Sequence, residues 1–279
     1  MAIITISRGS MSGGMILAEC LASNLGYPSL AREVLVKAAD KLNVPEDTLR
    51  LKIEKRAGFW ERLTSDRRIY IVALQSALAD ACINGDLVYH GNAGHMLLKD
   101  VPNVLRVRLI APLSVRIREM MERKGLNYQT ARDYINLDDE ERVRWTKFVY
   151  GLDWRDPKNY DLVINLKNID IPTACAMIAA AVKLPAFETT EEVKKKLRDF
   201  ALACRVKAAL AANVQSRGIE FEARSDDGRV EVFGEVASTG VLLRKAGPSE
   251  DDIRLIARTV EGVSEVTVNL RRFPEFPDS

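Results

Sequence analysis

The sequence predicts an α/β fold for residues 1–184, with a parallel sheet and helices on both faces, and a small α+β domain for residues 190–271. In the first part, short β-branched or apolar runs alternate with segments of helical periodicity, and strands separated by helices pair in parallel. In the second part, a helix precedes two alternating strands, and another helix precedes a third strand. The chain of 279 residues is long enough for both domains.

The first strand, loop and helix, in residues 3–25, have the layout of a phosphate-binding site. Residues 3–6 are a β-branched run, residues 9–14 (GSMSGG) are a loop, and apolar residues recur at helical spacing after it. Glycine lets backbone N–H groups converge on an anion, and the helix N-terminus adds partial positive charge. A tight structural turn is the alternative. The residues expected to bind phosphate are Gly9, Ser10, Met11, Ser12, Gly13, Gly14 and Met15.

The loop matches only half of the P-loop pattern GxxxxGK[ST]. Gly9 and Gly14 stand at the two glycine positions, so the backbone part of the pattern is retained. Met15 stands where the pattern has the phosphate-binding lysine, and Ile16 stands where it has the serine or threonine that binds Mg²⁺. The side-chain part is therefore missing.

The other elements of residues 1–184 follow in alternation. Strands are predicted at 28–30, 86–90, 104–111 and 160–166, and helices at 32–42, 69–83, 112–125, 128–144 and 171–182. Residues 44–47 restart a helix, and the charged segment 51–68 is interpreted as a surface helix or a cover over the site. Because ligands of parallel sheets bind at the carboxyl ends of the strands, the loops after residues 6 and 90 and the helix after residue 111 should meet there.

Several charged side chains have two interpretations. Arg116, Arg118 and Arg123 fit a solvated helix face, and contact with phosphate is the alternative. Arg106 and Arg108 share one face of a strand, either as an edge feature or as site residues. The two histidines, at positions 90 and 95, are too few for a metal site without carboxylates, so no metal ligand is expected.

The composition fits a globular protein that is close to electrical neutrality. Lys and Arg number 41 and Asp and Glu 39, which gives no general argument for binding nucleic acid. The four cysteines form no CxxC pair, so neither a zinc site nor a disulfide framework is expected, and a cytoplasmic location follows. We expect no signal peptide and no transmembrane segment, since the longest apolar run is too short to span a bilayer.

Five segments of residues 1–183 together resemble the cytidylate kinase-like branch of the P-loop nucleoside monophosphate kinases. They are ITISR with SGG, GNAGHMLLKD, VLRVRLIAPLSVRI, DEERVRW and YGLDWRDPKNYDLVIN. The resemblance implies a five-stranded parallel core, an insertion that binds the nucleoside monophosphate and a lid that closes over two nucleotides. It also implies transfer of a phosphoryl group from ATP to a nucleoside monophosphate, with Mg²⁺.

The resemblance also implies roles for particular residues. The glycine loop would hold the donor phosphates, with Arg8 beside it. Asp139 and Arg142 match a DxxR pattern of the lid, in which the arginine would contact the transferring phosphate. An ordinary ion pair between these two residues on one helix is the alternative.

The expected substrate-binding residues are Arg32, Asn92 and Arg116. Arg32 lies where a basic residue of the family commonly approaches the acceptor phosphate. Asn92 falls where many relatives have arginine, and Met15 also replaces a basic residue. Because phosphoryl transfer depends on charge placed around the phosphate oxygens, these two replacements affect turnover more than binding.

The second domain resembles the BON domain, through its element order and the segments GRVEVFGEV and VEGVSEVTVNL. The resemblance implies binding of a lipid or a protein partner, and the sequence of this part shows no catalytic constellation. Residues 184–189 are interpreted as a linker, and residues 190–271 are expected to fold alone. A module that covers the active site as a lid is the alternative.

Three functions follow from these observations. The first is an enzyme that resembles nucleoside monophosphate kinases, with an appended binding module. The second is a regulator that binds ATP or another phosphate ligand without catalysis, which Met15 and Ile16 favour. The third is a scaffold that binds no nucleotide.

Overall fold

The computed structural model describes residues 1–42, 64–216, 219–238 and 248–274, and these fall into two units. Among them, the first unit comprises residues 1–33 and 84–194, and the second comprises residues 34–42, residues 64–83 and the described residues from 195 onward. The predicted helical restart at 44–47 and most of the charged segment 51–68 lie outside the described residues.

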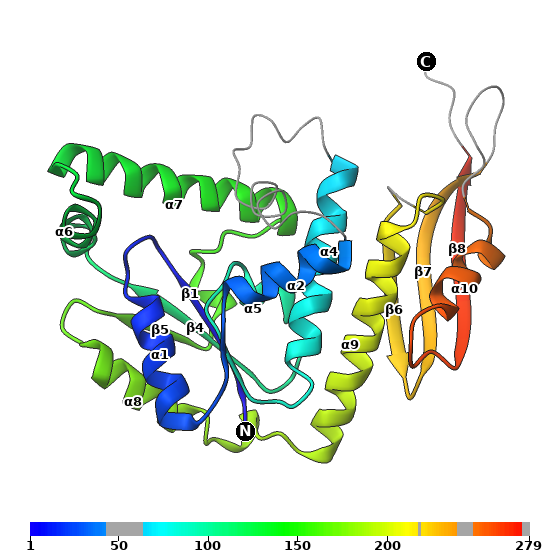
Figure 1. Cartoon of the computed structure of the whole chain (residues 1–279), viewed down its shortest axis with the longest axis horizontal. Coiled ribbons are helices and arrows are strands. Elements are labelled where there is room, and N and C mark those ends of the chain that lie inside the picture. Colours follow the sequence, from blue (N-terminus) through cyan, green and yellow to red (C-terminus); the bar gives the residue numbers. More distant parts are fainter. Residues whose placement is uncertain (43–63, 217–218, 239–247, 275–279) are drawn as a thin grey trace. The chain divides into compact units, whose positions relative to one another are not determined.

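The first unit is built on a parallel five-stranded sheet with strand order β2-β3-β1-β4-β5 (Figure 1). The central strand places Ile4 opposite Val88 on one side and opposite Leu105 on the other. This sheet confirms the predicted parallel α/β core. The strands are β1 (Ile3–Arg8), β2 (Ser29–Leu30), β3 (Leu87–Tyr89), β4 (Val104–Ile110) and β5 (Leu162–Asn165).

The helices of this unit begin and end at recognisable signals. Asn127 and Asp170 cap two helices by accepting backbone N–H groups three residues later, and Gly125 and Gly151 end two helices with a positive φ. The helices are α1 (Gly14–Leu25), α5 (Gly94–Leu97), α6 (Leu113–Lys124), α7 (Tyr128–Tyr150), α8 (Ile171–Ala181) and the 3-10 helices η2 (Pro157–Asn159) and η3 (Pro185–Phe187), while α2 (Arg32–Leu42) begins here and continues in the second unit.

Alternation along β1 divides its side chains between the two faces of the sheet. Ile4 and Ile6 belong to the main core, which α1 and α8 cover. Thr5 faces α5, since a Cβ on Gly94 would lie 3.2 Å from its methyl carbon. Ser7 follows on the same face as Thr5, and its hydroxyl meets that of Tyr160. Polar groups therefore gather on the α5 face at the carboxyl end of β1.

A disulfide between Cys20 of α1 and Cys175 of α8 joins the two helices that cover the main core. This pairing corrects the expectation of no disulfide. The two residues are 155 positions apart, so their spacing carried no signal, and only the packing of α1 on α8 brings them together. Cys82 and Cys204 are free and buried.

The second unit contains a three-stranded sheet of order β6-β7-β8. β6 pairs antiparallel with β7, and β7 pairs parallel with β8, which confirms the predicted order of elements. Its core includes Leu202, Val232 and Ile253. The elements are α4 (Thr64–Ala81), α9 (Glu191–Ala212), β6 (Phe221–Asp226), β7 (Arg229–Ser238), α10 (Glu250–Arg258) and β8 (Glu265–Pro274).

Helix α4 belongs to this second unit, which the sequence did not indicate. Ala79 packs against Ala201 and Cys204 of α9. Beside this contact, Lys41 of α2 forms an ion pair with Asp80 at 2.5 Å. An apolar contact and a charge pair thus tie α2 and α4 to the C-terminal part of the chain.

The segment expected to be a linker is ordered. It contains η3, and the hydroxyl of Thr189 lies within hydrogen-bond distance of the backbone oxygens of Met1 and Gly85 and accepts from Asn103 at 2.9 Å. Among the described helices, none alone is both long and apolar enough to cross a membrane, although the bent pair Ile171–Ala181 and Pro185–Ala212 passes the same test by length and composition.

Candidate functional site

The glycine loop follows the central strand β1 and leads into α1. Gly13 is the N-cap of α1 with φ of 74°, and no side chain caps the helix. Ser12 is buried, and its Oγ has no partner among the described residues. Because the first N–H groups of a helix lack partners within the helix, this end is suited to an anion.

Arg116 of α6 closes one side of the loop. Its Nε donates to the backbone oxygen of Ser10 at 2.6 Å, and its Nη1 pairs with the Asp139 carboxylate at 2.7 Å. A Cβ on Gly9 would lie 2.8 Å from Nη2 of Arg116, so only glycine leaves room for this guanidinium. Asp139 of α7 also accepts the backbone N–H of Ser10 at 3.2 Å. A carboxylate thus already occupies one donor of the loop.

Arg8 and Arg142 lie on the other side of the loop. The side chain of Arg8 passes so close to Gly14 that a Cβ there would overlap it. Arg142 of α7 donates to the backbone oxygen of Arg8 and pairs with Asp138 at 3.2 Å. Both cations therefore lie against the loop backbone.

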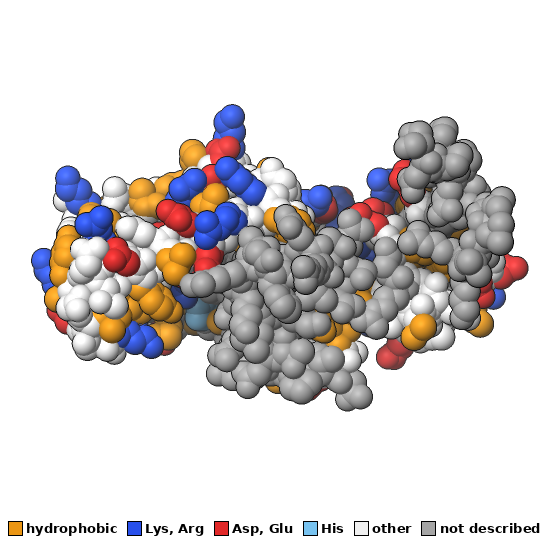
Figure 2. All heavy atoms as spheres, turned by 90° about the horizontal axis from the view of Figure 1, so that it is seen from above, with side chains coloured by type: hydrophobic (Ala, Val, Ile, Leu, Met, Phe, Trp, Pro, Cys, Tyr) orange, Lys and Arg blue, Asp and Glu red, His pale blue; other side chains and the backbone are white. Residues whose placement is uncertain are grey.

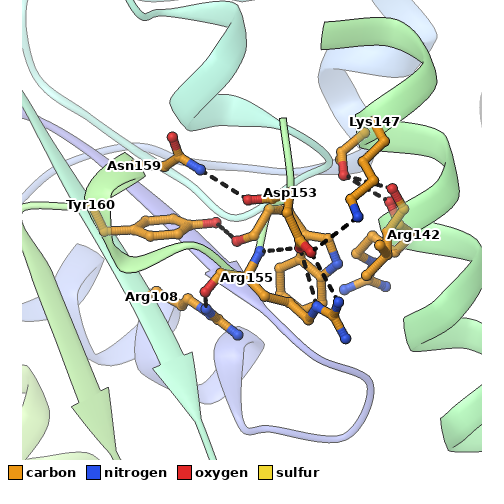
Figure 3. Close-up of polar contacts among 10 residues, drawn as sticks. Arg108, Arg142, Lys147, Asp153, Arg155, Asn159 and Tyr160 are labelled. Carbon is orange, nitrogen blue, oxygen red and sulfur yellow. Dashed lines mark hydrogen bonds and ion pairs between the residues drawn. The ribbon is translucent and has the colours of Figure 1, made fainter. Parts of the chain in front are cut away.

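A second group of cations lies beside the loop that precedes β5 (Figure 3). Arg108 of β4 donates to the backbone oxygen of Arg155, and its guanidinium carbon lies 4.9 Å from the centroid of the Trp154 ring. The guanidinium carbon of Arg142 lies 5.4 Å from the same ring. Arg155 pairs with Asp153 at 2.9 Å. Trp154 therefore links arginines from β4 and α7.

The positive charges of the arginines in this site are partly buried and only partly compensated. Desolvation is the main cause that lowers the pKa of Arg8, and the nearby Arg142 lowers it further. Desolvation also lowers the pKa of Arg108, whose Nε has no partner within the described part of the chain. The hydrogen bond from Arg155 lowers the pKa of Asp153 to about 2, so this carboxylate stays charged. An incoming anion would offset the free-energy cost of desolvating these arginines.

The structure brings most of the predicted site residues together. Arg8, Arg116, Asp139 and Arg142 all surround the loop of residues 9–14. The ordinary pair of Asp139 with Arg142 is not what the structure has, since Asp139 pairs with Arg116 and Arg142 pairs with Asp138. Arg116 is buried, which corrects the preferred assignment to a solvated helix face.

The other predicted residues lie elsewhere or at the periphery. Met15 and Ile16 are 46% and 44% exposed, so neither side chain closes the loop. Asn92 lies in the turn after β3, and its backbone oxygen accepts the hydroxyl of Tyr89 at 3.3 Å. Arg32 is the first residue of α2, and its side chain lies outside the described structure. Arg123 pairs with Glu119 on its own helix.

Arg106 and Arg108 are not edge features, because β4 lies between β1 and β5. The guanidinium of Arg106 donates to the backbone oxygens of Leu98 at 3.0 Å and Lys99 at 2.9 Å. Arg106 is therefore structural, because it donates hydrogen bonds to the backbone oxygens that follow α5, whereas Arg108 belongs to the candidate site. Their shared face was predicted correctly, but their different partners depend on the fold.

Arg155 and Tyr160 were not predicted as site residues from the sequence, and His95 was considered there only as a metal ligand. Arg155 and Tyr160 lie within the segment YGLDWRDPKNYDLVIN, which was the available signal. His95 is buried beside Tyr160, with ring centroids 4.7 Å apart. Burial, together with the positive charges of Arg106 and Arg108, lowers the pKa of His95 to about 4. His95 is therefore neutral near pH 7.

The site fits phosphate better than it fits a metal ion held by protein. In the described part of the chain, no group of three or more His, Cys, Asp or Glu side chains is placed to hold a metal ion. Asp138 and Asp139 both pair with arginines, and Ile16 offers no oxygen ligand. Any Mg²⁺ would therefore depend mainly on phosphate oxygens. On the left of Figure 2, Lys and Arg side chains lie interspersed with Asp and Glu side chains on the described surface.

A parallel sheet of this order, with a glycine loop between its central strand and a helix, defines a P-loop kinase-like protein. Residues 3–168 match the model of the cytidylate kinase-like family, and the chain belongs to this family. It is 28% identical to the cytidylate kinase of Methanothermobacter thermautotrophicus over 169 residues, which cover 60% of the chain and 97% of that protein.

Two further proteins are similar to the chain. It is 30% identical to the cytidylate kinase of Ignicoccus hospitalis over 168 residues, which cover 59% of the chain and 90% of that protein. The crystal structure of an uncharacterized protein from Eubacterium ventriosum superposes with a TM-score of 0.52 and 22% identity, covering 65% of the chain and 97% of that structure. This second likeness concerns the fold alone.

Proposed function

We propose that the protein is a phosphotransferase that moves a phosphoryl group from ATP to a nucleoside monophosphate, with cytidylate as the first acceptor to test. The observation that supports this most is the set of arginines at a glycine loop without its lysine. Arg8, Arg116 and Arg142 lie around this loop, and Arg108 lies beside the loop that precedes β5. Phosphoryl transfer needs little covalent chemistry from the protein, since positioning and compensation of charge supply most of the catalysis.

In this proposal the loop amides and the N-terminus of α1 bind the donor phosphates. Arg8, which lies beside Gly14, and Arg116, which lies beside Gly9, neutralise charge on these phosphates. Arg142 and Arg108, which both lie against the ring of Trp154, stabilise charge on the transferring group. Asp139 would release the N–H of Ser10 when a phosphate replaces its carboxylate. Mg²⁺, when bound with the nucleotide, would offset part of the negative charge of the phosphates.

A second candidate is a regulator that binds nucleotide without turnover, and Met15 and Ile16 favour it. Both side chains are exposed at positions where the P-loop pattern has its lysine and its hydroxyl. We further propose that residues 190–271 are a BON-like module that binds a lipid or protein partner and that the protein works in the cytoplasm. The order of helices and strands in that module supports the first of these two statements.

Binding and turnover should be measured separately. Calorimetric titration with ATP, CMP and dCMP, with and without Mg²⁺, tests binding, and a coupled assay of ADP release tests transfer. We expect ATP to bind and CMP to stimulate ADP release. ATP binding without stimulated release would favour the regulator, and no binding of either nucleotide would contradict both candidates.

The variant Arg142→Ala tests the assignment of the transferring phosphate. We expect kcat/KM to fall by about 100-fold, because an arginine that contacts transition-state charge contributes at least this much. Arg144→Ala is the matched control, since Arg144 lies on the same helix with its side chain 51% exposed. Equal activity of the two variants would contradict the assignment.

A further inference from the structure

We propose that the hydroxyl of Tyr160 is a positioning group that orders the arginines of the site by joining three separate elements. It meets Ser7 at the end of β1, His95 of α5 and the backbone oxygen of Trp154 in the loop before β5. This inference rests on the proposed function for its catalytic consequence, while the hydrogen-bond pattern itself can be tested without catalysis.

The number of donors fixes the direction of each hydrogen bond. A phenol has one proton to donate and can accept through its oxygen. The backbone oxygen of Trp154 can only accept, and it lies 2.6 Å from the Tyr160 oxygen, so it receives that proton. The Ser7 hydroxyl, at 3.0 Å, and the His95 Nε2, at 3.2 Å, must then both donate to Tyr160.

The surroundings agree with this assignment. Burial raises the pKa of Tyr160, so the phenol keeps the proton that it donates. His95 must carry its proton on Nε2, which leaves Nδ1 as the unprotonated nitrogen. Nδ1 is buried and has no hydrogen-bond partner among the described residues. The unprotonated form of Nδ1 is favoured there, because a proton on both nitrogens would place a positive charge in a buried position.

The contact with Trp154 leads directly to the cations of the site (Figure 3). Holding the backbone of Trp154 also holds the next residue, whose backbone oxygen accepts Arg108. The guanidinium groups of Arg108 and Arg142 both lie against the ring of Trp154. Tyr160 therefore acts through the loop on two arginines that come from different elements, and it need not touch the substrate.

The variant Tyr160→Phe removes the hydroxyl and retains the ring. We expect it to fold, because Asn159 also anchors the loop by donating to the backbone oxygen of Asp153 at 3.0 Å. We expect kcat to fall by about tenfold through misplaced arginines, while the ATP dissociation constant changes less than about threefold. Tyr134→Phe, at a position on α7 that is 55% exposed, is the control and should match the parent.

Two variants of His95 test the direction of the hydrogen bonds. Glutamine can donate an N–H to Tyr160 and should retain most activity, whereas leucine cannot and should lose part of the activity that Tyr160→Phe loses. The double variant His95→Leu with Tyr160→Phe should be no worse than Tyr160→Phe alone, because Tyr160→Phe already removes the hydrogen bond that His95→Leu removes. Additive losses, or unchanged kcat in Tyr160→Phe, would overturn the proposal. A parallel loss of ATP affinity in Tyr160→Phe would do the same, since it would indicate general damage to the site.

The imidazole signals in a ¹⁵N–¹H spectrum test the hydrogen bonds of the Tyr160 hydroxyl even if the parent protein shows no turnover. The chain has two histidines, so assignment needs only the His95→Gln variant. We expect His95 to show the Nε2–H tautomer from about pH 6 to 8 and to lose this fixed tautomer in Tyr160→Phe. An Nδ1–H tautomer in the parent would overturn the inference, whereas absence of turnover with the expected tautomer would contradict only the proposed function.

Discussion

Arg8 lies immediately before the glycine loop, and its side chain passes over Gly14, the residue that precedes Met15. In the proposed function, Arg8 would therefore supply from the strand side of the loop the cation that the P-loop pattern places after the last glycine. Arg8 is partly buried, and desolvation lowers the pKa of its side chain. A guanidinium that has lost water without gaining a full counter-charge is suited to bind phosphate.

Exchanging charge between positions 8 and 15 tests this assignment. Arg8→Met should weaken ATP binding by about 1.5–3 kcal/mol, the usual contribution of a hydrogen bond to a charged group. Met15→Lys should strengthen binding in the parent, and it should restore much of the loss when combined with Arg8→Met. Isothermal titration calorimetry measures all four proteins.

The control for this series is Arg118→Met, since Arg118 is an exposed arginine of α6. It should leave ATP affinity unchanged. If Arg8→Met binds ATP as well as Arg118→Met does, position 8 does not contact phosphate, and Arg116 or Arg142 must supply the charge instead.

At the scale of elements, the disulfide joins the helix that carries the glycine loop to the helix that covers the same face of the sheet. α1 and α8 already pack together, as Figure 1 shows. A cross-link between residues 155 positions apart closes a long loop of the unfolded chain, which lowers the entropy of the unfolded state.

Reduction of this disulfide should lower the free energy of unfolding by about 2–4 kcal/mol. Urea unfolding with and without dithiothreitol measures the change. The double variant Cys20→Ser with Cys175→Ser should have the stability of the reduced parent and should not respond to the reductant. A count of four reactive thiols in the denatured, unreduced parent would show that the disulfide is absent.

At the scale of the whole molecule, the contacts of the glycine loop lie within the first unit and the core of the three-stranded sheet lies within the second. The contacts of Arg8, Arg116 and Arg142 with the glycine loop all lie within residues 1–194. The core that covers β6, β7 and β8 is drawn from residues 202–270. Ala79 and Asp80 of α4, however, contact α9 and α2 in the second unit.

We therefore expect residues 1–186 and residues 190–279 to differ in stability when they are expressed as separate fragments. When expressed alone, residues 190–279 should unfold cooperatively in urea. Residues 1–186 should bind ATP within about tenfold of the parent, which corresponds to about 1.4 kcal/mol. Their melting temperature should fall, because Ala79 loses its contacts with Ala201 and Cys204. A larger loss of ATP affinity would show that the C-terminal part completes the nucleotide site.

The sequence by itself determined the features that depend on local pattern. The β-branched run and glycine spacing predicted β1, the loop and α1, and alternating residues predicted β6, β7 and β8. Glycine predicted the ends of α1 and α6, at Gly26 and Gly125, because capping is a property of a few neighbouring residues. The loop without its lysine was also visible directly at Met15.

Only the tertiary structure decided which distant side chains meet. Arg106 and Arg108 are two residues apart on one strand face, yet one satisfies the end of α5 and the other belongs to the site. Cys20 with Cys175, and Ser7 with Tyr160, are brought together by strand order and helix packing. Such contacts depend on how each element is placed by the whole core, and the spacing of residues along the chain carries no record of that placement.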